Sequence, residues 1–154
     1  MSEQAPETDT DEPLGFLIHE TSHAISQSFS TVMAPLGLTR PQVRVIIWTD
    51  HSPGITQAEL CERLNSSPMA MTGLLDRMEG KNLVKRVEDP KDRRVKRIFL
   101  TDGALALMPE MEKLAEQFKK EVRQGLTHRD ISTAQRVLAT MKANALKIKA
   151  DMND

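Results

Sequence analysis

The sequence has 154 residues and a formal net charge of −1. This length suffices for one domain with its own hydrophobic core, or for a domain with a smaller core that dimerisation completes. No apolar run approaches the roughly 20 residues that a membrane-spanning helix needs, and nothing resembles a secretory signal, so we expect no membrane partner. A single cysteine, Cys61, excludes an internal disulfide and is typical of the reducing cytoplasm, where we expect the protein to be located.

The first 13 residues are acidic. They carry five Asp or Glu side chains, two prolines and no basic side chain. Such a stretch cannot bury enough apolar surface to offset the entropy that ordering costs. We therefore predict a disordered acidic tail over residues 1–13.

A helix is predicted from Leu14 to Pro35, with Gly37 ending it in the left-handed conformation that glycine adopts easily. Its inner face repeats at alternating spacings of four and three residues, the helical period: Leu14, Ile18, Thr21, Ile25, Ser28 and Val32. We assign residues 14–37 to a dimerisation region and expect Leu14 and Ile18 in the subunit interface.

The same helix contains His19-Glu20-Thr21-Ser22-His23, which matches the H-E-x-x-H pattern of zinc proteases. Two histidines four residues apart share a helix face, as zinc ligation requires, but a catalytic site also needs a third protein ligand. No Glu, Asp or Cys occurs after Thr21 until Asp50. Three interpretations stay open: a zinc-dependent hydrolase, polar residues on an interface helix, and two histidines that line an effector pocket.

A second helix is predicted after Thr39, which caps it, with Pro41 and Gln42 in its first turn. The helix is strongly apolar because of four side chains: Val43, Ile46, Ile47 and Trp48. Arg44 interrupts this pattern, so it either points outward or pairs with a carboxylate. Residues 51–55 are predicted to form a turn, with a short strand that joins a later hairpin.

The middle of the chain predicts two helices joined by a tight turn. Thr56 and Glu59 form a capping box at the start of the first helix. Ser66 and Ser67 can cap the second, in which Pro68 takes the first position. Four side chains make the buried stripe of the second helix: Met71, Leu74, Leu75 and Met78.

The opposite face of that second helix carries mostly small and hydroxyl side chains and is expected to face outward: Ser67, Met69, Ala70, Thr72, Gly73 and Asp76. A helix with such a face can approach base edges in the DNA major groove closely. An ordinary amphipathic helix with a solvated outer face has the same pattern.

Two strands are predicted after Asn82, which tolerates the left-handed conformation at a helix end. Residues 83–87 and 95–100 alternate apolar and basic side chains over much of their length. Between Gly80 and Leu100 eight basic side chains stand against three acidic ones, which is typical of phosphate contacts and also of a solvated hairpin. Helix, turn, helix and basic hairpin together predict a winged helix-turn-helix over residues 38–100.

The last third of the chain predicts two further helices. Thr101 caps a long one with a buried stripe from Ala104 to Val122, in which Pro109 is expected to cause a kink or loosen the first turns. Thr127 and Asp130 form a capping box at the start of the other. Along this last helix apolar side chains recur at threes and fours as in a coiled coil: Ile131, Ala134, Leu138, Met141, Ala145, Ile148 and Met152.

We assign residues 101–154 to the dimerisation region. The interface is expected to include these side chains of the last helix: Ile131, Leu138, Met141 and Ile148. Packing of this seam within one subunit is the alternative.

Several stretches of the chain resemble the MarR (multiple-antibiotic-resistance regulator) family. They are Leu38-Thr39-Arg40-Pro41-Gln42, Thr56-Gln57-Ala58-Glu59-Leu60, the run from Leu75 to Val84, and the wing signature Asp89-Pro90-Lys91-Asp92-Arg93-Arg94 followed by Leu100-Thr101-Asp102-Gly103. The resemblance covers about Leu14 to Lys149 and implies a mainly α fold with a small β-wing. In such a fold a winged helix-turn-helix domain is flanked by N- and C-terminal dimerisation helices. Gly73, where many members carry a base-reading arginine, and Asn82, in place of the usual glycine, depart from the family pattern.

The resemblance also implies site residues. Arg94 would enter the minor groove from the wing tip, held by Asp92, and Arg77 would support the wing or contact phosphate. The full set of expected DNA contacts is Thr56, Gln57, Ser66, Ser67, Met69, Ala70, Thr72, Gly73, Arg77, Asp92, Arg93, Arg94 and Lys96. Family effectors bind in the cleft between the first helix, the second helix and the helix after the wing, which makes His19, His23, Arg44 and Trp48 the effector candidates.

These observations predict a homodimeric DNA-binding transcriptional regulator without a cofactor or metal, and not an enzyme. We expect a repressor that a small aromatic or anionic effector releases from a pseudo-palindromic operator on double-stranded DNA. The alternatives are the zinc-dependent hydrolase, a redox-sensing regulator that uses Cys61, and a winged-helix module that contacts only proteins. For Cys61, burial as a small hydrophobic side chain is the competing interpretation.

Overall fold

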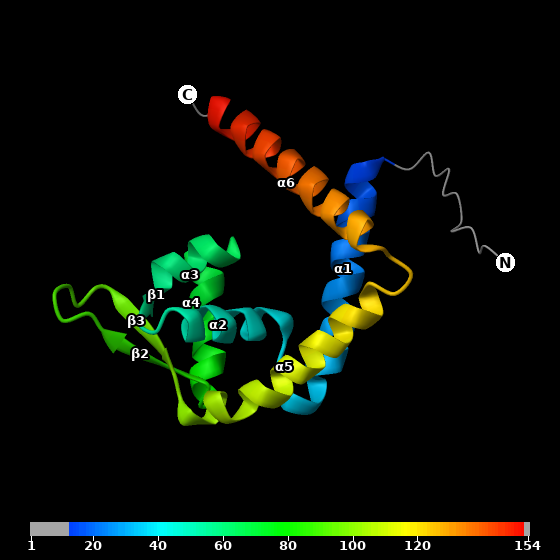
Figure 1. Ribbon diagram of the computed structural model, residues 1–154. Coiled ribbons are helices and arrows are strands. Elements are labelled where there is room, and N and C mark those ends of the chain that lie inside the picture. The colour runs from blue at the N-terminus through cyan, green and yellow to red at the C-terminus, as the bar shows by residue number, and fades with distance from the viewer. Residues whose placement is uncertain (1–12, 153–154) are drawn as a thin grey trace. The chain divides into compact units, whose positions relative to one another are not determined.

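The computed structural model describes residues 13–152 (Figure 1), so the predicted acidic tail lies, apart from Pro13, outside the described residues. In chain order the elements are α1 (Leu14–Met33), the short 3-10 helix η1 (Ala34–Leu36), α2 (Arg40–His51), β1 (Ile55–Thr56), α3 (Gln57–Leu64), α4 (Pro68–Gly80), β2 (Val84–Glu88), β3 (Lys96–Leu100), α5 (Asp102–Val122) and α6 (His128–Asp151). Over the described range no helix is long and apolar enough to cross a membrane.

The chain divides into two compact units, one that ends at Phe118 and one that starts at Lys119. The first unit holds α1 to β3 and most of α5. The second holds the end of α5 and all of α6. The sequence predicts that residues 38–100 form the winged helix-turn-helix and that the stretches on both sides mediate dimerisation. This division by function stays a prediction.

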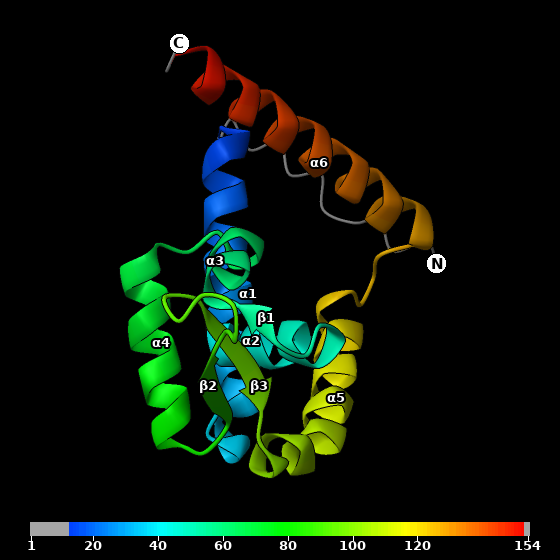
Figure 2. The same cartoon turned by 90° about the vertical axis from the view of Figure 1, so that its left-hand side faces the viewer.

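The three strands form one antiparallel sheet in the order β1-β3-β2. Ile55 of β1 lies opposite Ile98 of β3, and Val84 of β2 lies opposite Leu100. The predicted short strand therefore joins the hairpin. Figure 2 shows β2 on the side of the hairpin next to α4. The fold class predicted from the sequence, mainly α with a small β-wing, is confirmed.

Helix ends follow local sequence signals. The predicted capping boxes are present at Thr56 with Glu59 and at Thr127 with Asp130. Gly37 closes η1 with a φ of 66°, and Asn82 takes a φ of 54° in the left-handed region. At the start of α5 the Thr101 hydroxyl accepts a hydrogen bond from the Ala104 N–H at 3.3 Å, as its predicted capping role requires.

The core gathers apolar side chains from every helix of the first unit and from the sheet. The four side chains predicted as the buried stripe of α4 all belong to it: Met71, Leu74, Leu75 and Met78. They pack with Val45 and Ile46 of α2, Leu60 of α3 and Ile98 of β3. The core thus fixes the inner face of α4 and leaves its outer face free.

One glycine is required by the sheet. Gly54, just before β1, has a φ of 81°, and a Cβ built there would lie 3.0 Å from Cζ of Phe99. Any side chain at this position would be strained and would press on the ring. Gly54 therefore lets β1 approach β3 closely.

The long helix α5 differs from the prediction at its C-terminal end. It contains Pro109 in its interior, and the expected kink or loosening of the first turns stays a prediction. Ala104 and Met111 are buried as expected, but Val122, predicted as the end of the buried stripe, is 44% exposed. Earlier along the helix, Leu114 and Ala115 are partly buried against the core.

Shortening a core side chain of α4 is expected to destabilise the fold. Leu75 is fully buried, so Leu75→Ala should lower the free energy of unfolding by about 2–5 kcal/mol. Leu105 is 47% exposed, and Leu105→Ala should change it by only about 0.5 kcal/mol. Urea unfolding at one fixed protein concentration measures both, and equal losses would contradict the packing described above.

Candidate nucleic-acid interface

The turn between α3 and α4 is built by local hydrogen bonds. Asn65 ends α3 in the left-handed conformation with a φ of 49°. The Ser66 N–H donates to the Cys61 carbonyl at 2.9 Å, and the Ser67 hydroxyl accepts from the Ala70 N–H at 3.2 Å. Pro68 then occupies the first position of α4, where a missing N–H costs nothing. Of the two predicted caps, Ser67 takes this role, whereas the Ser66 hydroxyl donates to the Ser67 carbonyl at 3.4 Å.

The outer face of α4 is exposed and carries little charge. Met69 is 86% exposed, and Ala70 and Thr72 are also exposed, whereas Gly73 is half-buried. The Thr72 hydroxyl donates to the Pro68 carbonyl at 3.0 Å and accepts from Nε2 of Gln57 at 2.8 Å. The hydroxyl proton of Thr72 is thus already used within the protein. The exposed face formed by Met69, Ala70 and Thr72 therefore offers apolar contacts and no free hydroxyl donor.

Arg77 lies next to the position where the sequence departs from the family pattern. A Cβ built on Gly73 would be 3.5 Å from Nη1 of Arg77, so the guanidinium extends back along the helix over Gly73. Within residues 13–152 the Arg77 side chain makes no hydrogen bond or ion pair. Support of the wing and the phosphate contact, the two roles expected for Arg77, therefore both stay predictions.

The side chain that connects the wing to α4 is Arg86 of β2. Its Nε and Nη2 donate to Oε2 of Glu79 at 3.0 and 2.5 Å, and Nη2 also donates to Oδ1 of Asp76 at 2.5 Å. The Arg86 N–H donates to the other oxygen of Glu79 at 2.9 Å. The hydrogen bonds from Arg86 lower the pKa of Glu79, and those to Glu79 raise the pKa of Arg86.

This contact was missed from the sequence, where Arg86 was counted only as one of the basic side chains of the hairpin. A signal was present. Asp76 and Glu79 are three residues apart and so share one face of α4.

A second carboxylate organises the loop between β2 and β3. Oδ1 of Asp89 accepts from the N–H groups of Lys91 and Asp92, at 2.7 and 3.2 Å. Oδ2 accepts from Nε of Arg97 at 2.5 Å, and Nη1 of Arg97 donates to the Gly54 carbonyl at 2.9 Å. The Lys91 N–H, followed by Arg97, lowers the pKa of Asp89. Arg97 therefore joins the wing to the segment before β1.

The wing tip holds Arg94 as expected. Asp92 accepts from the backbone N–H of Arg94 at 3.0 Å and from its Nε and Nη2, both at 3.1 Å. The side-chain hydrogen bonds from Arg94, followed by that from its N–H, lower the pKa of Asp92. The Arg94 side chain is nevertheless 91% exposed, so it is oriented and remains accessible.

The other basic side chains of the wing have partners of their own. Nζ of Lys96 donates to Glu88 at 2.9 Å, and Nε of Arg93 lies 3.9 Å from the same carboxylate. Arg93 is 90% exposed and Lys96 is 41% exposed. Ion pairs this exposed contribute little to stability, so Lys96 and Arg93 can exchange the Glu88 carboxylate for another anion.

The histidine motif and the cysteine occupy separate places. The residues of the motif, His19-Glu20-Thr21-Ser22-His23, are all exposed on α1. Over residues 13–152 no group of three or more His, Cys, Asp or Glu side chains is arranged to hold a metal ion. Cys61 has a free thiol and packs, half-buried, against the core.

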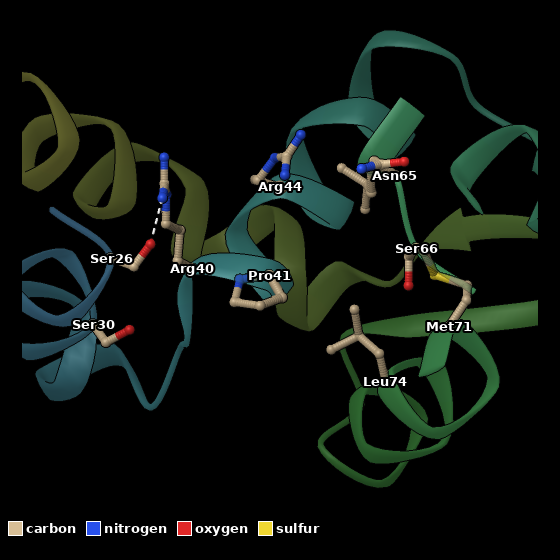
Figure 3. A pocket seen from close by; sticks show the side chains of 10 residues that line it. Ser26, Ser30, Arg40, Pro41, Arg44, Asn65, Ser66, Met71 and Leu74 are labelled. Atoms are coloured by element: carbon tan, nitrogen blue, oxygen red, sulfur yellow. Dashed lines mark hydrogen bonds between the residues drawn. The ribbon is translucent and has the colours of Figure 1, made fainter. Parts of the chain in front are cut away.

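A cavity lies between α1, α2, the turn after α3 and the inner face of α4 (Figure 3). Of the four effector candidates only Arg44 lines it. Trp48 stacks on His51, with ring centroids 6.0 Å apart, and the Arg63 guanidinium lies 4.6 Å from the Trp48 ring centroid. His19 and His23 do not line the cavity. Arg44 points outward and donates to the Arg63 carbonyl at 3.4 Å, which is the first of its two predicted arrangements.

Comparisons with known proteins agree with this geometry. The family model described as MarR family matches residues 36–95. Multiple antibiotic resistance protein MarR of Escherichia coli strain K12 is 30% identical over 127 residues, which are 82% of this chain and 88% of that protein. The HTH-type transcriptional regulator TtmR of Methylorubrum extorquens strain PA1 is 32% identical over 66% of this chain and 52% of its own length.

Solved structures show the same fold. A mutant MarR of E. coli complexed with operator DNA has a TM-score of 0.80 at 27% identity, covering 89% of this chain and 99% of that chain. The transcriptional repressor CouR bound to a 23-mer DNA duplex has a TM-score of 0.80 at 26% identity, covering 90% and 99%. Since this chain is 30% identical to MarR of E. coli over most of both proteins and shares its fold, it belongs to the MarR family of transcriptional regulators.

Proposed function

We propose that this protein is a dimeric, DNA-binding repressor that a small anionic or aromatic effector releases from a pseudo-palindromic operator, and that it acts in the cytoplasm. The observation that carries the proposal is the wing tip. Arg94 is 91% exposed and is oriented by three hydrogen bonds to Asp92. An arginine held in this way is suited to the narrow minor groove, whose negative potential attracts guanidinium groups.

The outer face of α4 supports insertion into the major groove. Its small side chains allow a close approach, and Met69 presents an exposed apolar side chain. Since the Thr72 hydroxyl is already engaged, apolar contact with thymine methyl groups is the expected form of direct readout. Arg77 would supply a phosphate contact beside it.

The second compact unit supports dimerisation. Along α6 the predicted seam is exposed in the single chain: Leu138 47%, Met141 36%, Ile148 61% and Met152 81%. Apolar side chains at coiled-coil spacing are normally covered by a partner. Leu14 of α1 is also 53% exposed. A two-fold dimer would place two copies of α4 about 34 Å apart, in successive major grooves.

Removal of the wing-tip charge should weaken DNA binding. Arg94→Ala is expected to cost about 1–3 kcal/mol of affinity for operator DNA and to reduce the salt slope by about one unit. Fluorescence anisotropy on DNA selected by the purified protein, at several salt concentrations, measures both. Arg136→Ala on α6 is the control. Unchanged binding by Arg94→Ala would favour a module that contacts only proteins.

Loss of thymine methyl groups should weaken the contact with Met69. In the selected operator, deoxyuridine in place of a contacted thymine should lower affinity about fivefold, because one buried methyl group contributes about 1 kcal/mol. Met69→Ala should remove this difference between the two DNAs, as in a double-mutant cycle. Equal binding of both DNAs by the unmodified protein, at every thymine tested, would contradict apolar readout.

A charge in the α6 seam should separate the subunits. Leu138→Asp is expected to give monomers in sedimentation velocity experiments and to abolish tight binding of the full operator. Ala143→Asp adds the same charge on the opposite face of α6 and should leave the dimer intact. A monomeric Leu138→Asp protein that still binds the full operator tightly would contradict the dimeric mechanism.

A further inference from the structure

Arg77 of α4 is an exposed cation without a partner in the described part of the chain, residues 13–152. The two carboxylates nearest to it on the helix, Asp76 and Glu79, are both bound by Arg86. Side chains three and four residues apart are neighbours on a helix, and these four positions around Arg77 hold no carboxylate: Gly73, Leu74, Gly80 and Lys81. Within residues 13–152, all five N–H groups of the Arg77 guanidinium are therefore free for an acceptor outside the protein.

The guanidinium of Arg77 lies over Gly73, one turn earlier on the same face of α4. A Cβ built on Gly73 would be 3.5 Å from Nη1 of Arg77. Side chains on a helix lean toward its N-terminus and cover the preceding turn. Because Gly73 has no side chain, the guanidinium can follow the helix surface closely. It therefore lies beside the N-terminal half of α4.

This N-terminal half is the part of α4 that would meet base edges, because a recognition helix contacts the bases with its N-terminal residues. In Figure 2 α4 lies at the edge of the first compact unit, with α3 and the hairpin to one side of it. The hydroxyls of Thr72 and Ser66 already donate to backbone carbonyls, and Met69 and Ala70 are apolar. Arg77 is therefore the residue that brings free, charged donors to this part of the helix.

We propose that Arg77 reads a guanine in the major groove, with two of its N–H groups donating to O6 and N7 of that base. This inference rests on the proposed function and deepens it, because it assigns base readout to a residue for which only a phosphate contact was expected. The guanine takes two of the five N–H groups, so the others stay available to a phosphate. With Met69 on a thymine methyl group, Arg77 predicts a half-site that presents both a guanine and a thymine to α4.

Replacement of guanine by 7-deazaguanine tests the contact, because this base lacks the N7 acceptor of the major groove. Each guanine of one half-site is replaced in turn in the operator selected by the purified protein, and fluorescence anisotropy gives the affinity. At one position the replacement should weaken binding at least about fivefold, since one charge-assisted hydrogen bond is lost. Inosine at that position keeps both major-groove acceptors and should bind like guanine. Equal weakening by inosine, or a selected half-site without any such guanine, would overturn the proposal.

The variant Arg77→Ala identifies the group of the protein that reads the guanine. It should bind the guanine and 7-deazaguanine operators equally, as in a double-mutant cycle, when both are measured at low salt where the complexes remain stable. Lys85→Ala removes another exposed positive charge and is the matched control, which should keep the full preference for guanine. A preference for guanine that survives Arg77→Ala would mean that Arg77 contacts phosphate alone, and the proposal would fail.

Two substitutions of Gly73 test the path of the guanidinium. A Cβ at 3.5 Å is an ordinary contact, so Gly73→Ala should keep the preference for guanine. Gly73→Leu puts a large side chain where the guanidinium lies and should reduce the preference at least about threefold. Alanine and leucine are both strong helix formers, so helix stability does not account for such a difference. The same preference in both variants would contradict the path over Gly73.

Failure of this inference and failure of the proposed function give different results. If the protein forms no specific complex with any DNA fragment, the proposed function is refuted and the base contact with it. If a specific complex forms but is indifferent to N7 of every guanine, the contact of Arg77 alone is refuted, and the wing and the seam of α6 keep their proposed roles.

Discussion

The position of the wing depends on one guanidinium group. Arg86 of β2 makes hydrogen bonds to both Glu79 and Asp76 of α4, and its own N–H adds another to Glu79. Its side chain is only 22% exposed, so these bonds are better shielded from solvent than those at the wing tip. Since β2 pairs with β3, the contact fixes the whole hairpin against the helix beside it.

The basic side chains of the hairpin therefore do different things. Arg86 and Arg97 are bonded within the protein: Arg86 holds α4, and Arg97, although 42% exposed, joins Asp89 to the Gly54 carbonyl. Arg93 and Arg94 are each about 90% exposed, and their carboxylate partners orient them without burying them. The excess of positive charge seen in the sequence therefore includes arginines that bind other parts of the protein as well as arginines that stay exposed. The exposed ones are the candidates for phosphate contacts.

Features set by neighbouring residues could be predicted from the sequence. The capping boxes at Thr56 and Thr127 and the left-handed Asn82 depend on residues at most a few positions apart, and all are present. The partners of Arg86 and Arg97 could not be predicted with the same rules, because strand register and the packing of β2 on α4 decide them. The contacts of Trp48 show the same limit, because its ring stacks on His51 and lies beside the guanidinium of Arg63, which belongs to a different helix. The effector role of His19, His23, Arg44 and Trp48 stays a prediction.

The two faces of α4 differ in composition and in exposure. Its inner face consists of long apolar side chains, and its outer face of Met69, Ala70 and Thr72, of which Thr72 is bonded to the Pro68 carbonyl and to Gln57 of α3. The cavity reaches the inner face at Met71 and Leu74, on the side away from the wing contact at Glu79 and Asp76. The second half of α4 is thus tied to the wing by the ion pairs of Asp76 and Glu79 with Arg86, while Met71 and Leu74 in its first half are held by burial in the core.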